Sequence, residues 1–129
     1  MKKKYKHAFD IEGNYPIAGL NQWARMSKFE RHNHDAKAKL YFSLLLKPYA
    51  GVFFFKEFEI ELRANTLHDI DNTIIIIKIF VDAIRKLGLA QNDNRKFYKS
   101  CRLLVDDSLE KKKYIISVSG IFKKKTQKK

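Results

Sequence analysis

The chain has 129 residues, which suits one domain, and 45% of them are hydrophobic, enough for a core and too many for wholesale disorder. Its 27 basic and 14 acidic residues give a formal net charge of +13, and its single cysteine excludes a disulfide framework and a cysteine-rich zinc site. We therefore expect a small cytoplasmic domain that has no signal peptide and does not span or bind a membrane.

The positive charge is concentrated at the two ends of the sequence. Four lysines lie within residues 2–6 and eight lysines, with no acid, lie within residues 111–129, which leaves 15 basic against 14 acidic residues between them. Lysine-rich ends attract polyanions by counterion release, and they equally keep a small protein soluble. Of the polyanions we favour nucleic acid, because the ends lack the apolar face of a membrane-bound amphipathic helix.

The first half of the chain predicts a strand, a helix and a second strand. Residues 5–12 alternate loosely and indicate a strand, which a Gly-Asn-Tyr-Pro turn ends at residues 13–16. A polar segment follows, and a helix is expected from about Asp35 to Leu46, because Pro48 disfavours its continuation. Residues 51–63 include apolar side chains that alternate with charged ones, which predicts a strand with one polar face.

The second half predicts a helix and two strands. Residues 73–87 include four consecutive isoleucines, which favour a strand by propensity, but at 100° per residue the apolar and charged positions separate onto opposite faces, which indicates a helix. Residues 96–105 and 114–118 indicate strands, and we expect Cys101 to be a buried thiol in the first of them. The order β-α-β-α-β-β predicts an α+β fold, one domain over residues 1–129 with helices packed on a mixed sheet.

The segment that carries the most chemical information is His68-Asp69-Ile70-Asp71-Asn72, between the second strand and the second helix. Asp69 and Asp71 are two residues apart, so their side chains project the same way in extended backbone, and two convergent carboxylates repel unless a cation or proton lies between them. Such oxygen ligands suit Mg²⁺. A third carboxylate, Asp93, follows the helix, but spacing does not say which end of the helix meets the other two. The alternative is that Asp71 or Asn72 caps the helix, that Asp69 favours the helix dipole and that Asp93 belongs to a turn.

At these residues the chain resembles the RusA-type Holliday junction resolvases. The resemblance is carried by Asp69-Ile70-Asp71-Asn72, by the helix end from Asp82 to Leu89, by the Asn92-Asp93 loop and by an early Pro16 to Asn21 feature. It implies a homodimeric, Mg²⁺-dependent endonuclease, with Mn²⁺ as an alternative metal, that nicks four-way DNA junctions. Carried over by position, Asp69, Asp71 and Asp93 would be its catalytic and metal-binding carboxylates.

Two positions depart from the family pattern. The family's paired Asp-Asp is Asn92-Asp93 in this chain, and Ile75 stands where the family has a lysine. Lys78 shares the polar face of the helix with Asp71 and is either the catalytic substitute for that lysine or a solvated surface residue. The alternative function is therefore a non-catalytic, structure-selective DNA-binding protein on the same scaffold. A lysine-tailed module that binds a protein partner is the third.

The polar segment before the first helix supplies candidate DNA contacts. Trp23 and Phe29 could stack on exposed bases, although core packing is the commoner fate of such side chains. His32-x-His34 is more typical of a polar loop than of a metal site, and His68 is either a proton shuttle or an exposed loop residue. The basic side chains predicted to contact phosphate are Arg25, Lys28 and Arg31.

Overall fold

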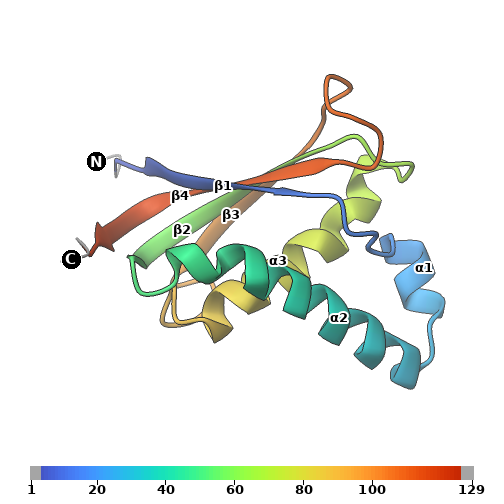
Figure 1. Ribbon diagram of the computed structural model, residues 1–129, viewed down its shortest axis with the longest axis horizontal. Coiled ribbons are helices and arrows are strands. Elements are labelled where there is room, and N and C mark those ends of the chain that lie inside the picture. Colours follow the sequence, from blue (N-terminus) through green and yellow to red (C-terminus); the bar gives the residue numbers. More distant parts are fainter. Residues whose placement is uncertain (1–3, 126–129) are drawn as a thin grey trace.

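The computed structural model describes residues 4–125 and has two layers, a four-stranded sheet and helices that cover one of its faces (Figure 1). The strands are β1 (Lys6–Gly13), β2 (Phe53–Ala64), β3 (Tyr98–Val105) and β4 (Tyr114–Lys124). They lie in the order β1-β4-β2-β3, in which β3 is parallel to β2 and the other neighbours are antiparallel. This mixed sheet confirms the predicted α+β fold.

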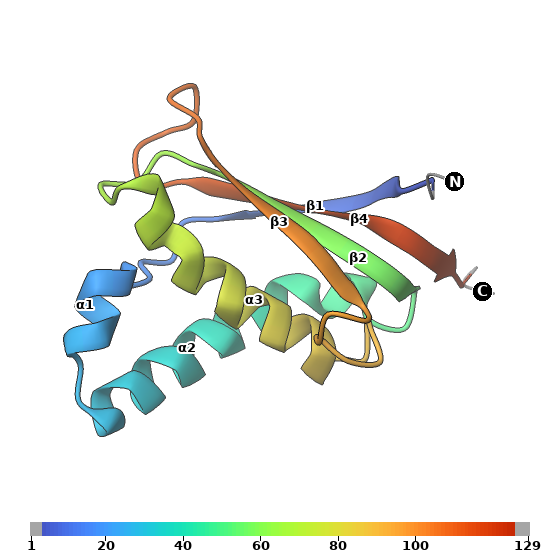
Figure 2. The same ribbon diagram turned by 180° about the vertical axis from the view of Figure 1, so that it is seen from behind.

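Helices α2 (Lys28–Leu46) and α3 (Ile74–Lys86) pack on each other and against the sheet, as Figure 2 shows from behind. The isoleucine run is therefore helical, as its spacing predicts, because eight of the thirteen residues of α3 are buried. A short helix, α1 (Leu20–Arg25), and two 3₁₀ turns, η1 (Lys47–Tyr49) and η2 (Ile70–Thr73), complete the fold.

Aromatic contacts in the core fix both long helices to the sheet. Phe42 of α2 contacts Phe80 of α3 edge-on, with ring centroids 5.4 Å apart, and Tyr114 of β4, with centroids 6.3 Å apart. All three side chains are at most 2% exposed. Because truncation of a buried phenylalanine typically costs about 3–5 kcal/mol, this cluster determines where α3 lies, and with it the residues at its two ends.

Two of the predicted boundaries were wrong. Helix α2 begins at Lys28 rather than near Asp35, because Ser27 and Glu30 form a capping box in which each side chain accepts a hydrogen bond from the other's backbone N–H, both at 3.1 Å. The last strand continues to Lys124 instead of ending at residue 118, since it pairs with the whole length of β2.

The prediction of a buried Cys101 was also wrong. Its side chain is exposed, as are those of residues 99–102 in general. The reason is the position of β3 at the edge of the sheet, where η2 packs against the strand and the long helices make little contact with it. The alternation of apolar and polar residues along β3 therefore does not predict which of its side chains are buried.

Candidate functional site

The segment that carries Asp69 and Asp71 is anchored at both ends. Asn65, directly after β2, donates a backbone hydrogen bond of 3.0 Å to the carbonyl of Lys113, in the connection between β3 and β4. The N–H of Asn72 donates to the carbonyl of Asp69 at 2.9 Å and closes η2 immediately before α3 begins. The two carboxylates therefore lie on a short segment that is fixed between the sheet and a helix.

Both carboxylates are exposed and unpaired. Neither Asp69 nor Asp71 has a side-chain hydrogen bond or ion pair with any residue that the structure describes. The expected extended backbone is wrong, because residues 70–73 form a 3₁₀ turn, so alternation does not align the two side chains. The alternative that Asp71 or Asn72 caps the helix is also wrong, because the N-cap of η2 is Asp69 and that of α3 is Thr73, and neither makes a side-chain cap hydrogen bond.

Asp93 lies at the other end of α3. Because β3 runs parallel to β2, residues that follow β2 and residues that precede β3 lie at opposite ends of these strands. The carboxylate of Asp93 is 3.8 Å from Nε of Arg85, in the last turn of α3, and a helix of 13 residues is about 20 Å long. One chain does not bring Asp93 to Asp69 and Asp71, and residues 4–125 hold no group of three His, Cys, Asp or Glu side chains that could bind a metal.

Lys78 lies in a groove between α3 and the two N-terminal helices. Its Nζ is 5.8 Å from the centroid of the Trp23 ring. Ile75, where the RusA-type resolvases have a lysine, is only 1% exposed, so of these two positions Lys78 alone reaches solvent. The groove has a volume of about 280 Å³ and is lined by Trp23, Asp35, Lys39, Ile75, Lys78, Ile79, Asp82 and Asp93.

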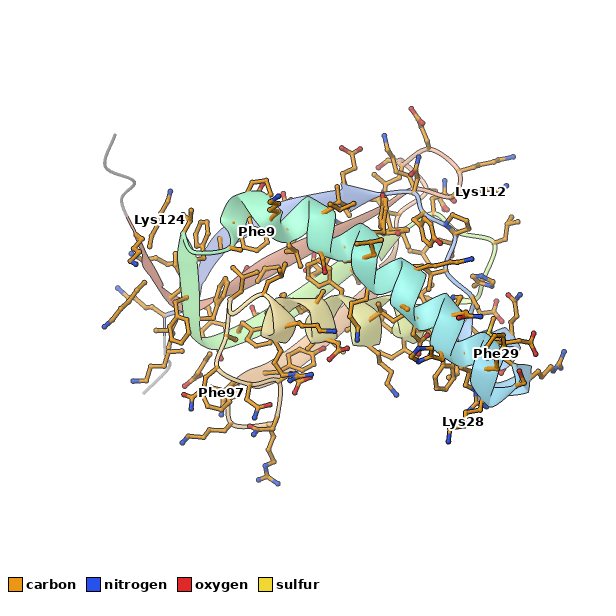
Figure 3. The ribbon with its side chains drawn as sticks, turned by 60° about the horizontal axis from the view of Figure 1, so that its bottom comes forward. Phe9, Lys28, Phe29, Phe97, Lys112 and Lys124 are labelled. Carbon is orange, nitrogen blue, oxygen red and sulfur yellow. The ribbon has the colours of Figure 1, made fainter. Side chains whose placement is uncertain are left out.

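The three predicted phosphate contacts have different surroundings. Arg31 donates to the carbonyls of Trp23 at 3.1 Å and Ala24 at 2.7 Å, and its guanidinium lies 4.5 Å from the centroid of the Trp23 ring. This arginine therefore satisfies the C-terminal end of α1. Arg25 and Lys28 are exposed where α1 meets α2, and they form no ion pair with the residues described. Figure 3 shows Lys28 at the tip of the molecule.

A polar network that sequence reasoning missed joins α1 to α2. The indole N–H of Trp23 donates to Oδ1 of Asp35 at 3.0 Å, and Nδ1 of His34 lies 2.9 Å from the same oxygen. The backbone N–H of Ala18 donates to Nε2 of His34 at 3.0 Å, so the imidazole proton is assigned to Nδ1. His34 is thus occupied on both nitrogens and lies on a helix, not in the expected loop. The Ser27-x-x-Glu30 capping box is the sequence signal that would have predicted that His34 lies on the helix.

His68 directly precedes Asp69 in the chain. Its ring packs against Gly19, in the segment that leads into α1. A Cβ added to Gly19 would lie 2.9 Å from Nδ1 of His68, so the ring approaches the backbone at a glycine that leaves room for it. The histidine is exposed and forms part of a cavity of about 290 Å³. This cavity is lined by Asn14, Tyr15, Pro16, Ile17, Thr66, Leu67, His68, Ile76, Lys112 and Tyr114.

No protein-family model matches the chain, and no curated protein matches its sequence. Within residues 4–125, no helix is both long enough and apolar enough to cross a membrane. The carboxylates and basic groups described above are therefore the features from which we infer a function.

Proposed function

We propose that the chain is a Mg²⁺-dependent endonuclease that acts on branched DNA, with four-way junctions as its substrate. The observation that carries this proposal is the pair of exposed carboxylates, Asp69 and Asp71, which have no partner among the described residues. They lie on a segment anchored to the sheet at Asn65 and followed directly by α3. Charged oxygen ligands held in place and left unneutralised are suited to a divalent cation.

The donor set fits Mg²⁺ in its usual protein environment. Magnesium is commonly bound by one or two carboxylates together with waters and substrate phosphates, so Asp69 and Asp71 suffice as the ligands that one chain supplies. When bound there, Mg²⁺ supplies an activated water and neutralises charge that develops on the phosphodiester. Mn²⁺ has the same preference for oxygen ligands and is the alternative metal.

A second copy of the chain is required if Asp93 is to join the same site. Because Asp93 and the Asp69–Asp71 pair lie at opposite ends of α3, the third carboxylate can reach the pair only from a partner chain. A two-fold homodimer would build two such sites at once, each from two chains, and would match the two-fold symmetry of a four-way junction. The homodimer is thus part of the proposal.

The basic and aromatic groups near α1 would bind the DNA beside the carboxylates. Helix α1 contacts η2, which carries Asp71, and the exposed Arg25 and Lys28 lie where α1 is followed by α2. Lys78 projects into the groove next to Trp23, where its charge can contact a phosphate. In this arrangement Arg31 acts indirectly, because it holds α1 in position through two backbone carbonyls.

The test is cleavage of a labelled mobile four-way junction beside a linear duplex of equal length, with Mg²⁺, with Mn²⁺ and with chelator. We expect paired nicks in opposite arms that require metal and that fall by more than about 100-fold in Asp71→Asn, since even outer-shell partners of a metal are worth about 10–100-fold. Asp107→Asn is the matched control, because Asp107 is exposed, also lacks a side-chain partner among residues 4–125, and lies in the turn after β3. Equal cleavage by both variants would overturn the proposal.

Two observations favour a non-catalytic DNA-binding protein as the second candidate. Ile75 is buried where the family has its lysine, and Asp93 is drawn towards Arg85. This candidate requires tight binding to junctions over duplex, no nicking with either metal, and unchanged binding by Asp71→Asn. The same gel and binding measurements therefore separate the two functions.

A further inference from the structure

The fold brings lysines from the start of β1 and from the end of β4 to one end of the sheet. Strand β1 starts where β4 approaches its end, because Lys6 pairs with Gly120 in antiparallel register, and Figure 1 shows both termini together on that side. The starts of β2 and β3 lie there too, since Phe53 pairs with Lys124 and Tyr98 pairs with Phe58. We call this the lysine end, defined by the exposed Lys4, Lys6, Lys56, Lys96, Lys123, Lys124 and Lys125.

The lysines of the lysine end form no ion pair with any other residue that the structure describes. None of Lys123, Lys124 and Lys125 forms an ion pair with the residues described, and all three line a groove of about 470 Å³ at the start of β2. Lys124 lies over the ring of Phe53, with Nζ 5.4 Å from the centroid, and the N–H of Lys125 donates to the carbonyl of Val52. The backbone that presents these charges is thus fixed by the sheet.

The lysine end and the carboxylates are separated by the length of the sheet. Pairing between β2 and β4 runs from Phe53 with Lys124 to Ala64 with Tyr114. These pairs are eleven residues apart along β2 (64 − 53), or about 36 Å at roughly 3.3 Å per residue. Figure 3 shows Lys124 and Lys112 far apart, on opposite sides of the view, and the N–H of Lys112 donates to the carbonyl of Asn65, which precedes the carboxylate segment. One turn of a DNA duplex has nearly the same length, about 34–36 Å.

We propose that the lysine end is a second contact surface for nucleic acid, which binds the phosphate backbone of a duplex arm about one helical turn from the segment that carries Asp69 and Asp71. The inference rests on the proposed function for the identity of the polyanion. An anionic membrane fits the surface less well. Phe54, whose side chain is 49% exposed, is the large apolar residue exposed here, and one such side chain does not form the apolar face that inserts into lipid.

The test compares the triple variant Lys123→Gln, Lys124→Gln, Lys125→Gln with wild type for junction binding in chelator, so that the answer does not depend on cleavage. Arms of about 15 base pairs span the proposed distance, and capped arms of about 7 base pairs do not. If all three lysines contact phosphate, the slope of log K against log salt on the long arms is less negative by about 2.7 in the triple variant. The affinity of wild type relative to the variant then increases about 40-fold as salt is lowered from 200 to 50 mM. On the short arms the two proteins should bind alike.

The matched control replaces Lys111, Lys112 and Lys113 by glutamine, which removes the same charge from the opposite end of β4. Its effect should be the same for both arm lengths. If the two triple variants behave alike, net charge alone explains binding and the inference is overturned. It is also overturned by an unchanged salt slope, or by a variant that loses affinity for anionic phosphatidylserine vesicles and not for DNA. Each of these results leaves metal-dependent cleavage at Asp71 untouched.

Discussion

The carboxylates at the two ends of α3 have the same chemistry and opposite surroundings. At its N-terminal end, Asp69 and Asp71 are exposed and have no partner among the described residues. At its C-terminal end, Asp82 pairs with Lys39 of α2 and, at 3.0 Å, with Arg85, while Asp93 lies 3.8 Å from the same arginine. The difference separates Asp82, which links α2 to α3, from Asp69 and Asp71, which link no elements of the described structure.

Asp82 stabilises the fold in its ionised form. Desolvation opposes the charge on Asp82, but the hydrogen bonds from Lys39 and Arg85 together outweigh it and hold the pKa of this carboxyl below its usual range. Its ionised form therefore links α2 to α3. The pair at Asp69 and Asp71 makes no such link, which leaves both carboxylates available to the cation that we propose.

The largest expected effect comes from a test of whether the carboxylates at the two ends of α3 act together across a dimer, with one end intact in each chain. Asp71→Asn and Asp93→Asn should each abolish metal-dependent nicking alone. When they are refolded together, mixed dimers regain one complete site, because one chain contributes Asp69 and Asp71 and its partner contributes Asp93. Random mixing restores about one quarter of the wild-type sites, which is the largest change predicted for any variant pair.

The control for this experiment is a mixture of Asp69→Asn with Asp71→Asn. Both substitutions fall on the same end of α3, so a mixed dimer contains no intact site and nicking stays at background. Recovery in this control, or none in the first mixture, would show that Asp93 does not act across a dimer.

Sequence reasoning predicted the strands and the isoleucine helix because the apolar residues of these segments recur at a regular spacing. In α3 the 3.6-residue spacing outweighed the strand propensity of Ile74 to Ile77, and the structure buries that face. The start of α2 was missed for a different reason. The segment around Ser27 is polar on most sides, and its helix depends on the capping box with Glu30 rather than on an apolar stripe.

The candidate site could be predicted only in part. The pattern of Asp69 and Asp71 identified the segment, but not the 3₁₀ turn at residues 70–73 that replaces extended backbone. The position of Asp93 depends on whether β3 is parallel to β2, which no local pattern reports. The joining of Lys6 and Lys124 in one basic end likewise follows from strand order alone.

A second prediction concerns stability. Substitution of Asp82 should lower it and substitution of Asp71 should not, whereas cleavage depends on Asp71. Asp82→Asn removes two partly exposed ion pairs, so we expect a loss of about 0.5–1 kcal/mol and a fall in Tm of about 3 °C. Asp71→Asn removes no partner and should stay within about 0.5 kcal/mol of wild type. Thermal unfolding of both proteins without metal measures the difference. A large loss in Asp71→Asn would mean that this carboxylate also holds the fold.

The smallest expected effect is the pH dependence of the Asp82 contribution. Because its pKa is lower in the folded than in the unfolded chain, the stabilisation is present above the unfolded value, about pH 3.9, and disappears as pH falls through the folded value. The Tm gap between wild type and Asp82→Asn should therefore be constant from about pH 5 to 7 and close below about pH 4. Asp71→Asn controls for the loss of one negative charge. A gap that persists at the lowest pH would assign the effect to packing of the side chain against Lys39 rather than to its charge, and would remove the electrostatic distinction between the two ends of α3.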